Sequence, residues 1–173
     1  NQNFQQALEN LTHINQICHY GNKKFLVYLS MGFGNPYGEK WSVELALEWC
    51  KKISDLGVRY INLSDTIGKA EPDDISKLFM LCKEHLPDVE FGAHFHTRPD
   101  NYLNNINAAY NAGCRKFDSA IKGFGGCPFA TDKLTGNLPT ESLISFLNLN
   151  GISHKIKQKE FDESFILAAD VFK

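Results

Sequence analysis

"VEFGAHFH", residues 89–96, is a short apolar run that ends in two histidines. A helix pattern precedes it from Pro72 to His85, and another follows from Pro99 to Gly113. A continuous apolar run of this length between two helices is typical of a parallel strand that is buried on both faces. We therefore expect a strand–helix unit here, with polar residues gathered at the carboxyl end of the strand.

The same unit recurs along the chain about every 30 residues, the usual length of a β-α-β repeat. Further apolar runs lie at 24–30, 58–65 and 114–121, and helix patterns lie at 4–20, 42–56, 140–150 and 161–172. We expect one α/β domain over 1–173: a helix over 1–20, four β/α units over about 24–150 and a helical tail over 151–173. Two architectures fit, a small doubly wound sheet or part of a (β/α)8 barrel.

Composition bounds the class of protein. The chain has 173 residues, of which 43% are hydrophobic and 22% charged, with a net charge of -2. It has no basic excess that would predict a nucleic-acid partner, and no run approaches the roughly 20 apolar residues of a membrane span. Five cysteines without close paired spacings favour a reducing compartment, and we expect the cytoplasm. Since no initiator methionine is present, the sequence is consistent with a fragment or a processed chain.

The two histidines of the third run form an H-x-H pair. On a strand, His94 and His96 point to the same face, with roughly 7 Å between their backbone positions. This spacing suits two ligands that converge on one metal ion. The alternative is that one histidine packs in the core while the other faces a solvated loop.

The fourth run leads into a glycine-rich segment, "IKGFGGCPFATDKLTGN", residues 121–137. Gly123, Gly125 and Gly126 precede Cys127 and Pro128. Glycine permits positive φ and close approach of the backbone to a ligand, whereas proline stiffens the chain. The segment is either a surface loop with a spare cysteine or a pliable loop that presents a thiol to a site.

Four motifs in this order carry a resemblance: "DTIG", "AHFH", "GFGGCPFA" and "TGNLPTE". Together they resemble the hydroxymethylglutaryl-CoA lyase family, part of the metal-dependent lyase and Claisen-condensing TIM-barrel superfamily. The resemblance runs from about residue 25 to residue 149, and its most specific part is the glycine segment. It implies that the chain supplies strands five to eight of a (β/α)8 barrel with their helices, plus a C-terminal helix.

The resemblance also implies an activity, the cleavage of 3-hydroxy-3-methylglutaryl-CoA to acetyl-CoA and acetoacetate with a divalent cation, Mg²⁺ or Mn²⁺. Residue by residue, His94, His96 and Asn137 match the metal ligands, and Cys127 matches the catalytic cysteine. The loop glycines would then let the segment close over the site. Weaker candidates for substrate binding are Asp65, Thr66 and Glu141, each of which can equally serve a turn or a helix start.

One departure from the family pattern concerns the metal site. Thr97 stands where family members often have an acidic residue after the second histidine, so the orientation of the histidines must come from elsewhere. The resemblance implies an acyl-CoA partner, and the open strand edges of a half-barrel predict a homo-oligomer. The alternatives are an isopropylmalate synthase-like enzyme, a hydroxy-ketoacid aldolase, or a half-barrel without catalytic activity.

Overall fold

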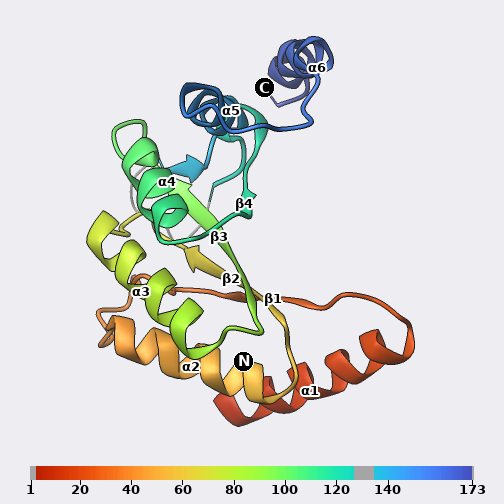
Figure 1. Cartoon of the computed structure of the whole chain (residues 1–173), viewed down its shortest axis with the longest axis vertical. Helices are drawn as coiled ribbons and strands as arrows, with labels where there is room; N and C mark the ends of the chain where they lie inside the picture. Colours follow the sequence, from red (N-terminus) through yellow and green to blue (C-terminus); the bar gives the residue numbers. More distant parts are fainter. Residues whose placement is uncertain (1–2, 127–134, 173) are drawn as a thin grey trace.

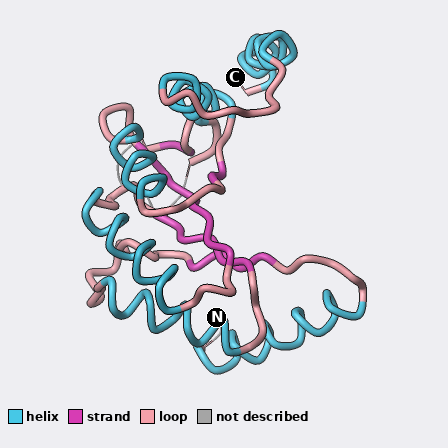
Figure 2. Tube along the Cα trace, in the orientation of Figure 1, coloured by secondary structure: helices cyan, strands magenta, loops and turns pink. Residues whose placement is uncertain are grey.

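The computed structural model describes residues 3–126 and 135–172. Its central feature is a parallel sheet whose strands follow one another in chain order: β1 (Leu26–Leu29), β2 (Tyr60–Asp65), β3 (Glu90–Thr97) and β4 (Phe117–Asp118). The strands run side by side through the middle of the molecule (Figure 2). A doubly wound sheet would reverse its strand order at some point, and this one does not. The order is that of a stretch of a (β/α)8 barrel.

The helices that connect the strands lie on one side of this sheet (Figure 1). They are α2 (Val43–Asp55), α3 (Pro72–His85) and α4 (Tyr102–Asn111). Right-handed crossovers between neighbouring parallel strands place successive helices on the same face, as in a barrel. The other face of the sheet, which is the inner face in a barrel, is therefore left to side chains alone.

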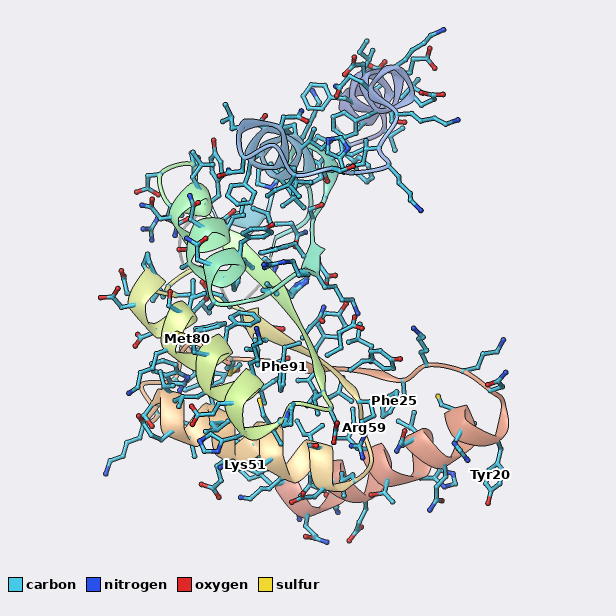
Figure 3. The ribbon with its side chains drawn as sticks, viewed as in Figure 1. Tyr20, Phe25, Lys51, Arg59, Met80 and Phe91 are labelled. Atoms are coloured by element: carbon cyan, nitrogen blue, oxygen red, sulfur yellow. The ribbon has the colours of Figure 1, made fainter. Side chains whose placement is uncertain are left out.

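The core lies between the sheet and these helices. Ile61 and Leu63 of β2 are fully buried there together with Leu78 of α3. Phe91 of β3 packs against the same core, whereas Met80 is 54% exposed on the outer side of α3 (Figure 3). Since side chains alternate along a strand, Asn62, which lies between Ile61 and Leu63, faces the opposite way.

The remaining elements lie at the two ends of the sheet. Helix α1 (Phe4–Tyr20) begins with a capping box formed by Asn3 and Gln6. Its Phe4 ring stacks at 4.7 Å, centroid to centroid, on Trp49 of α2. At the other end the short helix η1 (Ile121–Gly123) leads to strand β5 (Gly136–Asn137), which pairs antiparallel with β3, and to α5 (Thr140–Leu149) and α6 (Gln158–Val171).

The sequence prediction is confirmed for the order and type of the helices and the four parallel strands, and some bounds differ. The fourth strand, expected over 114–121, forms a ladder with β3 only at Phe117–Asp118, and beyond it Ala120 makes an isolated parallel bridge to Pro139. Helix α4 starts at Tyr102 rather than at the expected Pro99, since the Asn101 side chain accepts from the Arg98 amide and holds a turn. The antiparallel β5 was not expected at all.

Within residues 3–126 and 135–172, no helix is both long enough and apolar enough to span a bilayer.

Candidate metal centre

His94 and His96 lie on β3 and project from the inner face of the sheet, away from the helices. Their ring centroids are 5.3 Å apart, and the two rings stand nearly perpendicular at 86°. Metal–imidazole bonds are about 2.1 Å long, so two rings at this separation can each direct one nitrogen to a common ion. The structure thus brings the predicted pair together in a geometry suited to one metal.

Each histidine has a partner at Nδ1. His96 Nδ1 lies 3.2 Å from the main-chain oxygen of Asp65, and His94 Nδ1 lies 3.2 Å from Asp118 Oδ2. Because a carbonyl and a carboxylate only accept hydrogen bonds, we assign the proton of both neutral rings to Nδ1. Both Nε2 atoms then carry a lone pair, the state in which imidazole binds a metal.

The His96 ring is the more deeply buried of the two. Burial, and to a smaller extent the neighbouring His94, lowers the pKa of the His96 imidazole. A lower pKa keeps the ring neutral around neutral pH. His96 is therefore available as a ligand without first losing a proton.

Asn137 lies directly opposite His96 in the antiparallel pairing of β5 with β3, so both side chains are on the same face. Its Nδ2 donates to the carbonyl oxygens of Phe124, at 2.8 Å, and Gly125, at 2.9 Å. These two acceptors fix which end of the amide is the nitrogen. Oδ1 is accordingly the atom that Asn137 can offer a cation.

The loop glycines position Asn137. Gly123 has φ 64, and a Cβ there would lie 2.8 Å from the Asn137 main-chain oxygen. Gly125 has φ 84, and a Cβ there would lie 2.9 Å from Asn137 Nδ2. The main-chain N–H of Asn137 also donates to the Gly125 carbonyl oxygen, at 3.0 Å. Both glycines thus allow residues 123–125 to pass close to β5, a role that the sequence did not indicate. At Gly126, an added Cβ would make only an ordinary contact with the Thr135 main-chain oxygen. The predicted catalytic residue Cys127 lies outside the described residues.

Asp65 and Thr66 join the strand ends around the site. The buried Asp65 carboxylate accepts from the amides of Lys69, at 3.0 Å, and Ala70, at 2.8 Å. Thr66 Oγ1 accepts from the Met31 amide at 2.8 Å, which ties the end of β1 to that of β2. These contacts are those of turn residues, and direct contact of either side chain with a substrate stays a prediction.

Glu141, at the start of α5, accepts from the Lys122 amide at 3.0 Å. Lys122 has φ 57, so the carboxylate holds a turn with an uncommon backbone conformation. Its expected contact with substrate likewise stays a prediction.

The residues present fit a divalent cation. Two imidazole nitrogens and an amide oxygen can each donate a lone pair to such a cation, and this set by itself does not select the metal. Over residues 3–126 and 135–172, no cluster of three or more His, Cys, Asp or Glu side chains could hold a metal. The candidate site is formed by His94, His96 and Asn137, and further ligands would have to come from other residues or from water.

Three polar residues of the inner face were not among the predicted site residues. Tyr28 lies opposite Asn62, and Asp118 lies opposite His94. Tyr28 Oη donates to Asp118 Oδ2 at 2.8 Å, and Asn62 Nδ2 donates to the same oxygen at 2.9 Å. A signal was present for Tyr28 and Asn62, which are polar residues inside mostly apolar runs. Asp118 had no such signal, because its run also contains two basic residues and a serine.

Comparison with known proteins identifies the family of this chain. A model of the HMGL-like family matches residues 2–165. The chain belongs to the HMGL-like family. Membership agrees with the barrel-type strand order of the sheet.

The similar proteins act on acyl-CoA compounds, as their names state. The chain is 31% identical over 153 residues to hydroxymethylglutaryl-CoA lyase of Pseudomonas mevalonii. The aligned residues make up 88% of the chain and 50% of that enzyme. It is 34% identical over 128 residues to (R)-citramalyl-CoA lyase of Chloroflexus aurantiacus, covering 74% of the chain and 40% of the relative. Its fold matches an HMG-CoA lyase of Acinetobacter baumannii in complex with coenzyme A and 3-methylmalate, with a TM-score of 0.84 and 29% identity over 97% of the chain and 55% of the neighbour. The chain thus spans about half the length of the relatives that it matches, and its fold is part of a TIM barrel.

Proposed function

We propose that this chain is a fragment of a divalent-metal-dependent carbon–carbon lyase, and that the intact protein cleaves 3-hydroxy-3-methylglutaryl-CoA to acetyl-CoA and acetoacetate; this chain alone lacks the other half of the barrel. The observation that carries the proposal is the geometry of His94 and His96, whose Nδ1 atoms both have acceptors while both Nε2 atoms remain for a metal. Membership of a family with lyase relatives supports it, since that family makes a lyase a better choice than a synthase or an aldolase.

His94, His96 and Asn137 would hold the cation, with Nε2, Nε2 and Oδ1 as the donor atoms. When bound, the cation would supply a Lewis acid next to the C3 hydroxyl and the carboxylate of the substrate. The part of this chain is to orient both imidazoles, to keep His96 neutral through its burial, and to fix the side-chain amide of Asn137 through the carbonyls of Phe124 and Gly125.

The bond changes follow from the substrate. A base removes the proton of the C3 hydroxyl, and the bond between C2 and C3 breaks. The electron pair of that bond stays on C2 and forms the enolate of acetyl-CoA. We assign the proton that completes acetyl-CoA to the thiol of Cys127, on the resemblance of "GFGGCPFA" to the family motif. The other product, acetoacetate, keeps the former hydroxyl oxygen as its ketone.

The proposal extends to partners and compartment. The substrate is an acyl-CoA, in line with the neighbour that holds coenzyme A. The cysteines at 18, 50, 82 and 114 are free thiols, as expected in a reducing compartment, and we propose the cytoplasm. We also propose a homo-oligomer, because unpaired strand edges such as the outer edge of β1 favour association.

The test is turnover with a defined substrate. The intact protein, with the other half of the barrel present, is incubated with 3-hydroxy-3-methylglutaryl-CoA and either Mg²⁺ or Mn²⁺, and acetyl-CoA and acetoacetate are measured, with a chelator as the control. Equal amounts of both products that depend on the metal are expected. Metal binding without either product would show that the substrate is a different one.

A second candidate substrate is (R)-citramalyl-CoA, favoured by the 34% identity to the lyase of that name. Both compounds are compared under the same conditions. A higher kcat/KM for (R)-citramalyl-CoA would reverse the order of the two candidates while leaving the lyase assignment in place.

A further inference from the structure

Three donors converge on one oxygen atom of the inner face. Asp118 Oδ2 lies 2.8 Å from Tyr28 Oη, 2.9 Å from Asn62 Nδ2 and 3.2 Å from His94 Nδ1. Each donor comes from a different strand, and the parallel register brings them together, since Tyr28 pairs with Asn62 and His94 pairs with Asp118. The carboxylate therefore has little freedom to turn away from the histidine.

The two other donors are themselves held in place. Asn62 is 0% exposed, and its amide fits only because Gly92 beside it has no side chain. The Tyr28 ring meets the His94 ring edge to face, with centroids 5.4 Å apart. Burial, and to a smaller extent Asp118, raises the pKa of the Tyr28 phenol, which keeps it a hydrogen-bond donor.

The contact is poorly suited to a purely stabilising role. The side chains of His94 and Asp118 are 30% and 29% exposed, so water competes for the contact between them. A carboxylate that accepts from the far nitrogen of a metal-binding imidazole instead fixes its tautomer and its orientation. Thr97 leaves β3 without an acidic residue after the second histidine, and Asp118 supplies a carboxylate from the neighbouring strand.

We infer that Asp118 is the positioning residue for His94: it holds the proton of the ring on Nδ1 and turns Nε2 toward the metal, while Tyr28 and Asn62 hold Asp118. The inference rests on the proposed function, because it concerns a ligand of the proposed metal centre. It adds a residue that does not itself contact the metal or the substrate.

The first test needs no substitution. In the metal-free protein labelled with ¹⁵N-histidine, NMR at alkaline pH reports which ring nitrogen of His94 carries the proton. The expected result is protonated Nδ1 and bare Nε2. Predominant protonation of Nε2 overturns the inference.

The second test measures Mn²⁺ affinity by calorimetry. Asp118→Ala removes the acceptor and should weaken binding about 10–100-fold, the usual loss for a partner of a metal ligand. Asp118→Asn can place its amide oxygen where the three donors converge, so it should retain more affinity than the alanine variant. Asp162→Asn, the same chemical change on the exposed side of α6, should bind like the unaltered protein.

The outcomes separate this inference from the proposed function. If Asp118→Ala binds Mn²⁺ within about threefold of the unaltered protein while His94→Ala does not bind, the metal centre stands and the positioning role fails. If His94→Ala also binds normally, the metal centre itself is wrong. Should Asp118→Ala not fold, as judged by circular dichroism, the NMR result on the unaltered protein decides.

Discussion

The contact between Gly92 and Asn62 gives a prediction whose magnitude follows from the structure. In Gly92→Ala, the new Cβ would overlap Asn62 Oδ1 and lie 2.9 Å from its Cγ. Asn62 is fully buried, so its amide cannot move into solvent and must turn away from Asp118. The substitution thus acts on the hydrogen-bonded group around Asp118 without altering any polar side chain.

Two costs add up. The hydrogen bond from Asn62 to the Asp118 carboxylate contributes about 1.5–3 kcal/mol, as bonds to charged groups do. Forcing a methyl group into a packed site costs about 1–3 kcal/mol. Reduced freedom of the unfolded chain returns about 0.4–1 kcal/mol in a Gly→Ala change. The free energy of unfolding should therefore fall by roughly 2–5 kcal/mol.

A double-mutant cycle in urea unfolding measures the contact itself. Asn62→Ala alone loses the hydrogen bond, but Asn62→Ala with Gly92→Ala has room for the new methyl group and should be about as stable as Asn62→Ala. The coupling energy should then equal the loss caused by Gly92→Ala alone, roughly 2–5 kcal/mol. Gly21→Ala is the control, because its φ is negative and its added Cβ would come only to 3.3 Å from a main-chain oxygen, a much milder approach than that at Gly92. Additive losses within about 0.5 kcal/mol, or a loss below about 1 kcal/mol for Gly92→Ala, would refute the reasoning.

Three further predictions concern single side chains. Asp65→Asn places an amide N–H against the amides of Lys69 and Ala70 and should cost about 1–3 kcal/mol in urea unfolding, yet leave Mn²⁺ affinity unchanged; lost affinity would put the carboxylate in the site. Burial lowers the pKa of His96 from 6.5, so the unfolded chain takes up a proton first on acidification. The free energy of unfolding should fall as the pH drops below about 6.5, and a His96→Gln variant that shows the same fall would contradict this. Cys127 should be alkylated before Cys114, whose pKa burial raises to about 11, and peptide mapping that finds Cys114 labelled first would refute the order.

The strand–helix units could be predicted from the sequence because each has a strong local hydrophobic pattern. The run at 58–65 and the helix from Pro72 to His85 alternate as a barrel requires, and both are found within two residues of their expected bounds. The doubly wound alternative could not be excluded from the sequence, because strand order is set by how units pack rather than by any one unit. The two-residue β5 escaped notice, since its Gly136 is a poor strand former and pairs only because the chain folds back onto β3.

The candidate site was predictable in part. The H-x-H spacing was enough to place His94 and His96 on one face. The position of Asn137 depends on the antiparallel pairing of β5 with β3, and no local sequence pattern predicts that pairing. Asp118 was missed because its role depends on the register between β3 and β4, and its sequence neighbours do not reveal that register.

The central claim is that His94 and His96 bind one divalent cation. Calorimetric titration with Mn²⁺ compares the unaltered protein with His94→Ala, His96→Ala and, as the control, His13→Ala on the exposed side of α1. The account predicts one Mn²⁺ site, lost in both strand variants and unchanged in the control. Unchanged Mn²⁺ affinity in both His94→Ala and His96→Ala would contradict it.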